Sequence, residues 1–143
     1  KQRANALGIG DRVEITHGFI DMVEYLAAAD VFCFPAQDEG MGTPLLEGLS
    51  SGTPVVANAD EPSFGEWIID GENGYLAPLN AEQWASAVEA AAEFGETQRK
   101  RMSQSVKARI SSDVIDKQYL RLMNTLAETA PDQAVDVEQV LSS

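Results

Sequence analysis

Two short apolar runs separated by a long connection constrain the fold of this chain more than any other feature. The first run is Val31-Phe32-Cys33-Phe34, closed by Pro35, and the second extends from Pro54 to Ala57. Twenty residues separate Phe34 from Val55, which is too long for a hairpin and long enough for a crossover helix. Strands joined in this way are parallel, and a continuous apolar run is typical of a strand buried on both faces of a sheet. The sequence therefore predicts an α/β fold in which residues 31–34 form the most buried strand.

The alternation of strands and helices continues along most of the chain. After Pro78 the pattern is helical only, with Asn80 as the N-cap of one helix and Asp113 as the N-cap of a later one. These elements together predict a three-layer Rossmann-like parallel sheet of about four strands, followed by C-terminal helices. The remaining expected strands are residues 13–16 and 75–77, and the expected helices before Pro78 are residues 20–29, 43–51 and 62–69.

The two ends of the chain differ from its middle. Residues 1–128 are predicted to form a single partial domain, and residues 129–143 an acidic C-terminal tail. Leu7-Gly8 is typical of a helix that ends at a C′ glycine, so we expect a domain truncated at its N-terminal side.

Charge and cysteine content exclude several classes of function. Ten Lys and Arg against 23 Asp and Glu give a formal net charge of −13, and this field repels phosphate backbones and anionic lipids. We therefore expect no nucleic acid partner. We also expect no membrane insertion and a cytoplasmic location, because no apolar run approaches about 18 residues. The single cysteine can form neither an internal disulfide nor a thiolate zinc site, and we expect no metal site.

The loop after the first apolar run is where a parallel sheet of this kind would bind a ligand. Gly40 and Gly42 allow the backbone to approach a ligand closely, while Thr43 is predicted as the N-cap and Pro44 as the first residue of a helix. Exposed amides at a helix N-terminus suit a diphosphate. The alternative is a tight strand-to-helix turn that needs glycine for steric reasons alone.

Two carboxylates flank this turn. Glu39 and Glu47 lie eight positions apart, one in the loop and one early in the helix, so both can face one ligand. A carboxylate accepts hydrogen bonds from adjacent hydroxyls, as a ribose or hexose diol offers them. Glu47 cannot be a capping-box glutamate, because Pro44 has no side-chain oxygen. A favourable charge near the helix N-terminus remains an alternative role for Glu47.

With these motifs in place, residues 30–78 resemble the carboxyl-terminal, donor-binding Rossmann domain of retaining GT-B glycosyltransferases of the glycosyl transferases group 1 type. The paired glutamates are followed by Ser51-Gly52-Thr53-Pro54-Val55-Val56 and by Asp70-Gly71-Glu72-Asn73-Gly74 at the distances typical of that family. The resemblance continues upstream through residues 7–13 and Gly18, and downstream to the helix of Trp84.

The resemblance implies a nucleotide-sugar donor as substrate, no cofactor, and an enzyme that transfers a hexosyl unit to an acceptor with retention and without an obligatory metal. Glu39 matches the catalytic-site glutamate that contacts donor-sugar hydroxyls, and Glu47 matches the glutamate that holds the ribose. Donor contacts are further implied for the backbone of Gly40, Met41, Gly42 and Thr43, for Gly18 and Phe19 near the base, and for Glu66, for which a surface role is the alternative.

The chain also departs from the family pattern. Family members carry an aromatic residue where Met41 stands, which puts sugar stacking in doubt. The printed residues contain no counterpart of the Gly-Arg and Lys-Gly segments that neutralise the diphosphate, nor of the N-terminal acceptor-binding domain. We therefore expect this fragment itself to be inactive, and its exposed sheet edge to favour self-association. A GT-B-like nucleotide-sugar epimerase and a non-catalytic binding domain are the alternative functions.

Several reactive residue types are assigned structural roles. His17 is predicted to pack in the core or at its edge, Cys33 to be buried in its strand, and Trp67 and Trp84 to lie in the core or at its rim. Half of the basic residues gather in one predicted helix, where we expect a solvated face: Arg99, Lys100, Arg101, Lys107 and Arg109.

Overall fold

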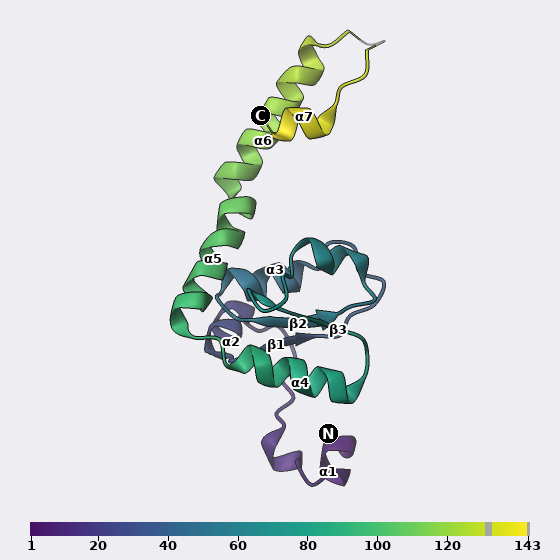
Figure 1. The fold of residues 1–143 in the computed structure, drawn as a ribbon, viewed down its shortest axis with the longest axis vertical. Helices are drawn as coiled ribbons and strands as arrows, with labels where there is room; N and C mark the ends of the chain where they lie inside the picture. The colour runs from purple at the N-terminus through teal and green to yellow at the C-terminus, as the bar shows by residue number, and fades with distance from the viewer. Residues whose placement is uncertain (131–132, 143) are drawn as a thin grey trace.

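The chain folds into a three-layer α/β body from which a C-terminal helix extends (Figure 1). The structure, a computed structural model, describes residues 1–130 and 133–142. Three parallel strands, β1 (Phe32–Phe34), β2 (Val55–Asn58) and β3 (Gly74–Ala77), form a sheet in the order β1-β2-β3. In its register, Phe32 pairs with Val55 and Val55 with Gly74. The predicted fold class is confirmed, with three strands in place of about four.

The central strand β2 is the most buried one. All four of its residues are buried, whereas Phe32 and Phe34 of β1 are half-buried and Cys33 is exposed. The prediction that residues 31–34 form the most buried strand is wrong, because β1 lies at an edge of the sheet and pairs only with β2. A strand reaches full burial when it has neighbours on both edges and helices on both faces.

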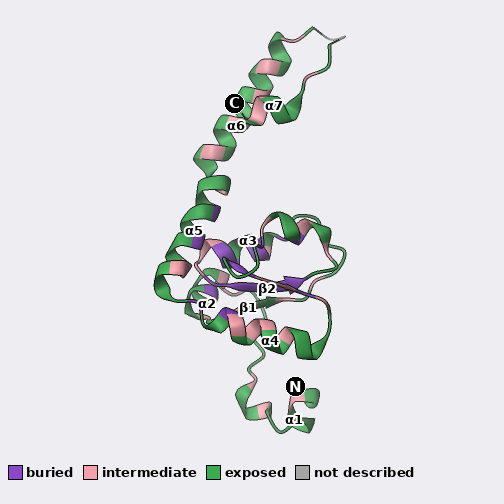
Figure 2. Cartoon of the chain, viewed as in Figure 1, coloured by how far each residue is buried: buried purple, intermediate pink, exposed green. Residues whose placement is uncertain are grey.

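Helices cover both faces of the sheet (Figure 2). On one face, α3 (Thr43–Ser50), the 3₁₀ helix η2 (Pro62–Glu66) and α5 (Glu96–Ile110) enclose the larger core. On the other face, α4 (Ala81–Ala92) packs on β2 and β3. Asn80 is the N-cap of α4 as predicted, since its Oδ1 accepts hydrogen bonds from two backbone amides at 3.0 and 3.1 Å. Trp67 packs against the first core and Trp84 against the second, which confirms their predicted places.

The N-terminal segment contains α1 (Gln2–Ala6) and a 3₁₀ turn η1 (Gly10–Arg12), but no strand. Gly8 has φ +72°, the left-handed conformation predicted for a helix-ending glycine. The predicted strand at residues 13–16 is absent, because these residues have no neighbouring strand with which to form a ladder. The following helix, α2 (Met22–Ala28), is capped by the side chain of Asp21.

The predicted helix at residues 62–69 is shorter than expected. It is the 3₁₀ helix η2 and ends at Glu66. Asn73 provides the physical reason: its Oδ1 accepts a hydrogen bond from the Ile69 amide at 2.8 Å, and its Nδ2 donates one to the Trp67 carbonyl at 2.7 Å. These bonds satisfy the backbone groups that a continuing helix would have paired.

The C-terminal helices are α5, α6 (Ser112–Glu128) and α7 (Val137–Ser142). The N-cap of α6 is Ser111 and not the predicted Asp113, which lies in the first turn. Helix α6 extends away from the α/β body, and α7 packs back along it (Figure 1). None of the described helices is long and apolar enough to cross a membrane. Five large apolar side chains of α6 are exposed: Ile115, Tyr119, Leu120, Met123 and Leu126.

Candidate functional site

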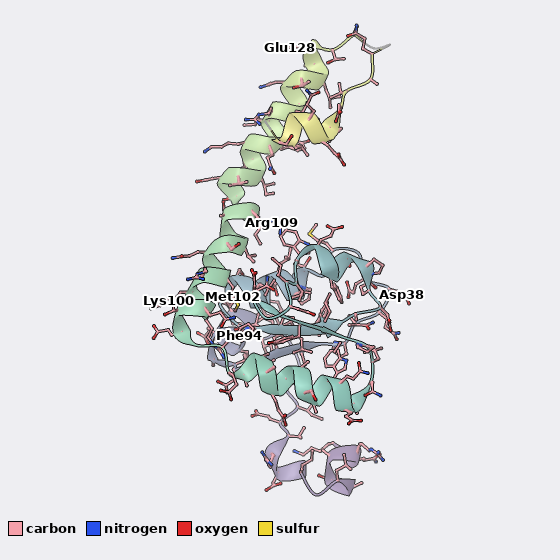
Figure 3. All side chains as sticks on the ribbon, viewed as in Figure 1. Asp38, Phe94, Lys100, Met102, Arg109 and Glu128 are labelled. Carbon is pink, nitrogen blue, oxygen red and sulfur yellow. The ribbon has the colours of Figure 1, made fainter. Side chains whose placement is uncertain are left out.

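The candidate site lies at the carboxyl ends of β1 and β2, where two loops leave the sheet side by side. Residues 35–42 follow β1 and residues 59–61 follow β2. Figure 3 shows Asp38 at this end of the molecule, and Lys100, in the first half of α5, at the opposite end. Ligands bind at this edge in parallel α/β sheets, because the loops diverge there and helix N-termini point towards it.

The turn into α3 is fixed by Gly42. This residue is the N-cap of α3, with φ 69° and ψ 51°, and it is buried. A Cβ atom at this position would lie 2.7 Å from Cε1 of Phe64, so only glycine fits. The prediction that Thr43 is the N-cap is therefore wrong by one residue. Thr43 is the first helical residue, and in the described structure its side chain caps no backbone amide of the helix.

Four successive backbone amides at this turn are unpaired. Within the described chain, no hydrogen bond involves the N–H of Gly40, Met41, Gly42 or Thr43. The first N–H group with an intrahelical partner is that of Leu45, which donates to the Gly42 carbonyl at 2.8 Å. Unpaired N–H groups and the positive end of a helix dipole together favour an anionic ligand.

The two predicted carboxylates flank this turn. Glu39 and Glu47 are both exposed, and neither carboxylate has a hydrogen-bond partner among the described residues. Helix α3 lies close on the sheet, since a Cβ atom on Gly48 would be 2.9 Å from Cδ1 of Phe32. Glu47, the residue before Gly48, is exposed to solvent. Met41 is also exposed, at 61% of its maximum.

The loop after β2 supports the loop after β1. The side chain of Asn58 is 1% exposed, and its Nδ2 donates to the Ala36 carbonyl at 3.2 Å. Glu61 accepts a hydrogen bond from the Glu39 amide at Oε2, 3.1 Å away, and one from Ser63 Oγ at Oε1, 3.3 Å away. Asn58 and Glu61 are not among the predicted site residues. Their position directly after a predicted parallel strand was the signal that could have found them, because it places them at the same sheet edge.

Glu66 lies in η2 and is exposed. Its carbonyl accepts a hydrogen bond from Arg109 Nη1 at 3.3 Å, and the Arg109 guanidinium carbon lies 4.0 Å from the Trp67 ring centre. Arg99 also bonds to backbone carbonyls, those of Phe94, Ala29 and Asp30. The predicted solvated basic face is therefore wrong for Arg99, which is half-buried and attaches α5 to the body. It holds for the exposed residues Lys100, Arg101, Lys107 and Arg109, although Arg109 also contacts the body at Glu66 and Trp67.

The remaining predicted site residues lie in the segment before α2. Gly18 and Phe19 are exposed, and in the described structure no hydrogen bond or ring contact joins either residue to the Glu39 loop. His17 is exposed as well, so its predicted packing is wrong. The absence of a strand at residues 13–16 removes the surface on which it would have packed. Cys33 is exposed too, so the prediction that it is buried in its strand is wrong. Partial burial of its thiol nevertheless raises the pKa of Cys33.

The site is negatively charged. Six carboxylate residues lie in residues 35–47 and 58–66, and neither range includes a Lys or Arg. In the part of the chain that the structure describes, no three His, Cys, Asp or Glu side chains form a group that could hold a metal ion. The six carboxylate residues are Asp38, Glu39, Glu47, Asp60, Glu61 and Glu66.

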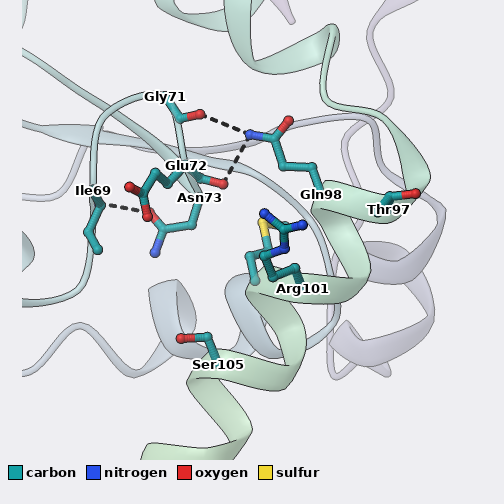
Figure 4. A pocket seen from close by; sticks show the side chains of 9 residues that line it. Ile69, Gly71, Glu72, Asn73, Thr97, Gln98, Arg101 and Ser105 are labelled. Carbon is teal, nitrogen blue, oxygen red and sulfur yellow. Dashed lines mark hydrogen bonds between the residues drawn. The ribbon is translucent and has the colours of Figure 1, made fainter.

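A cavity of about 520 Å³ lies elsewhere, between α5 and the turn that precedes β3 (Figure 4). Gln98 closes one side of it, because its Nε2 donates to the carbonyls of Gly71 and Glu72 at 2.9 and 3.1 Å. Arg101 also lines this cavity. Since the turn precedes β3, the cavity is at the amino end of the parallel sheet and is separate from the Glu39 loop.

The chain is similar in sequence to known proteins. The chain is 38% identical over 88 residues to the lipopolysaccharide core biosynthesis glycosyltransferase LpsE of Rhizobium meliloti, a match that covers 60% of this chain and 25% of LpsE. It is 34% identical over 82 residues to the lipopolysaccharide glucosyltransferase WaaG of Escherichia coli, covering 56% of this chain and 22% of WaaG. The matched part thus spans about a quarter of the length of these curated relatives.

The fold also matches solved structures. Anabaena Alr3699/HepE, crystallised in complex with UDP and glucose, superposes with a TM-score of 0.72 at 24% identity. That match covers 90% of this chain and 35% of the Anabaena chain, and it bears on the fold. The sequence profile of the family described as glycosyl transferases group 1 matches residues 1–109, about three quarters of the chain and all of the site described above. This chain therefore belongs to the glycosyl transferases group 1 family.

Proposed function

We propose that this chain forms the donor-binding part of a retaining glycosyltransferase, which transfers a hexosyl unit from a nucleoside-diphosphate sugar to an acceptor. The observation that carries the proposal is the turn before α3. There, the unpaired amides of Gly40–Thr43 lie between two exposed carboxylates, Glu39 and Glu47. Amides at a helix N-terminus suit a diphosphate, and carboxylates suit sugar hydroxyls. Family membership and the relatives named as sugar transferases support this assignment.

Each residue has a proposed role in this site. Glu39 contacts hydroxyls on the reacting face of the donor sugar, and the backbone of Gly40–Thr43 faces the sugar and the diphosphate. Glu47 holds the ribose hydroxyls. Glu66, which follows β2, lines the donor pocket, and Gly18 and Phe19 lie near the base. The N-terminus of α3 stabilises the charge that develops on the departing diphosphate, so the reaction needs no obligatory metal and no cofactor.

We further propose that the 143 residues alone bind donor weakly and transfer nothing. Residues 35–47 and 58–66 contain six carboxylates and no Lys or Arg, so nothing in them neutralises the two phosphate charges. The net charge of −13 adds a long-range repulsion. We expect a Kd on the order of millimolar or weaker for a nucleoside diphosphate. Transfer also requires an acceptor held close to the donor, and this chain spans about a quarter of its curated relatives.

Titration calorimetry with nucleoside diphosphates and their sugars tests the assigned roles. Glu47→Ala should weaken the binding of nucleoside diphosphate and of nucleotide sugar alike, because the ribose is common to both. Glu39→Ala should leave nucleoside diphosphate binding unchanged and weaken only nucleotide-sugar binding. Glu89→Ala is the matched control, since it removes the same charge from an exposed position on α4, on the other face of the sheet. Equal effects of all three substitutions, or micromolar binding by the isolated chain, would contradict the proposal.

The anomeric outcome is tested with the natural protein that contains these residues. NMR of the first product formed should show the same anomeric configuration as the donor, and chelation of divalent metals should leave transfer intact. An inverted product would contradict the proposed reaction. Turnover of a nucleotide sugar in the absence of any acceptor would identify an epimerase instead, and binding of a partner without any nucleotide would identify a non-catalytic domain.

A further inference from the structure

The loop after β1, residues 35–42, is held at both ends by residues of the segment 58–64. At its start, Asn58 Nδ2 donates to the Ala36 carbonyl at 3.2 Å. At its end, Gly42 lies against the ring of Phe64 so closely that no side chain fits between them. Residues 37–41 lie between these anchors, and all five are exposed.

One hydrogen bond fixes the middle of this loop. Among residues 37–41, the only backbone amide with a hydrogen bond in the described structure is that of Glu39, which donates to Oε2 of Glu61 at 3.1 Å. The preceding residue, Asp38, has φ 56°, a conformation that residues other than glycine seldom adopt. The Glu39 amide therefore follows a strained residue, and a charged acceptor holds it in place.

The carboxylate of Glu61 is itself held in position. Its second oxygen, Oε1, accepts a hydrogen bond from Ser63 Oγ at 3.3 Å, and the side chain is half-buried. Its backbone is fixed as well, because its amide donates to the Asn58 carbonyl and its carbonyl accepts from the Phe64 amide. A side chain held at its backbone and at both oxygens is an ordered support and not a freely rotating surface group.

We propose that Glu61 is a positioning residue for Glu39. Its carboxylate fixes the Glu39 backbone so that the Glu39 side chain faces the donor sugar, while the ribose contact at Glu47 does not depend on it. This inference rests on the proposed function. Loss of the Glu61 carboxylate should therefore separate the two halves of the donor: recognition of the sugar weakens, and recognition of the nucleoside diphosphate persists.

Two variants test this in the natural protein that contains these residues. Glu61→Ala removes the acceptor, whereas Glu61→Gln keeps a side-chain oxygen that can accept from the Glu39 amide. Hydrogen–deuterium exchange of a peptide spanning residues 37–41 reads out the hydrogen bond without any donor present. Exchange should be faster by about tenfold in Glu61→Ala and close to the original rate in Glu61→Gln.

Donor binding is the second readout. In Glu61→Ala, affinity for the nucleotide sugar should fall by about tenfold while affinity for the nucleoside diphosphate is unchanged, and Glu61→Gln should restore most of the loss. Ser63→Ala, which frees Oε1 alone, should have a smaller effect in the same direction. The midpoint of thermal unfolding is measured for each variant, since a purely structural role would lower it and weaken both ligands equally.

The possible results separate the inference from the proposed function. If the unmodified protein binds no nucleotide sugar, the proposed function fails, and the exchange data still decide whether Glu61 orders the loop. If it binds nucleotide sugar and Glu61→Ala binds it equally well, the inference is overturned and the function stands. Tighter binding by Glu61→Ala would overturn it too, because Glu61 would then compete with the donor for the Glu39 amide. Parallel loss of both ligands would make Glu61 a structural residue.

Discussion

At the scale of single residues, the site depends on one position that tolerates no side chain. Gly42 combines a left-handed backbone with contact against Phe64, and it begins the helix whose unpaired amides form the proposed diphosphate site. Gly40, two residues earlier, has neither constraint, because nothing lies within 4 Å of the place where its Cβ would be. Two glycines that look equivalent in the sequence thus differ, because the fold requires glycine at position 42 and has no such requirement at position 40.

This difference predicts unequal effects of the same substitution. Gly42→Ala should lower the free energy of unfolding by about 2–4 kcal/mol, because a left-handed alanine is strained and its methyl group overlaps the Phe64 ring. Gly40→Ala should change it by less than about 1 kcal/mol. Urea unfolding followed by circular dichroism measures both. Equal costs for the two variants would show that the close contact between Gly42 and Phe64 does not exist in solution.

At the scale of elements, α5 is attached to the body by arginine side chains that bond to backbone carbonyls. Arg99 donates to the Phe94, Ala29 and Asp30 carbonyls at 3.0, 3.3 and 2.7 Å, which links the start of α5 to the connection between α2 and β1. Its fork of donors suits several acceptors at once, and a lysine could not reproduce this geometry. Arg101, two residues later, is exposed and has no hydrogen bond in the described structure.

Substitution of these two arginines should therefore separate a structural contact from a surface charge. Arg99→Ala should lower the free energy of unfolding by about 1–3 kcal/mol, because it leaves carbonyl groups without donors in a partly buried place. Arg101→Ala removes the same charge from the same helix and should change it by less than about 0.5 kcal/mol. Thermal unfolding at one fixed ionic strength compares them. A similar loss for both variants would mean that net charge, and not the carbonyl contacts, is responsible.

The elements also show which features could be predicted from the sequence. The strands at 55–58 and 74–77 and the helices with clear caps were predictable, because apolar runs and capping residues act locally. The absence of a strand at residues 13–16 and the edge position of β1 were not predictable. Both depend on which strands become neighbours in the sheet, and a local sequence pattern does not show this. The Glu39 and Glu47 pair followed from spacing. Glu61 did not, because its role depends on two loops that meet only after folding.

For the molecule as a whole, two surfaces favour association between copies of the chain, and the net charge acts against it. The side of β1 that faces away from β2 has no strand partner in the described structure, and α6 has a row of exposed apolar side chains. Such surfaces favour association. The net charge of −13 acts against it, because two copies repel each other at distances within the Debye length.

The balance predicts self-association that depends on salt. In sedimentation experiments with reductant present, the 143-residue chain should be monomeric at about 20 mM KCl, where the Debye length is roughly 20 Å. It should form dimers at about 0.5 M KCl, where screening limits the repulsion to a range of a few ångströms.

Two substitutions of equal charge then locate the contact. Cys33→Lys places a charge on the exposed middle of β1, and Tyr119→Lys places one on the apolar row of α6. If dimers form through the sheet edge, Cys33→Lys should abolish them at high salt, and Tyr119→Lys should leave them intact because it adds the same charge elsewhere. The reverse result would assign the contact to α6. A monomer at every salt and protein concentration would mean that three residues of free edge are too short to recruit a second copy.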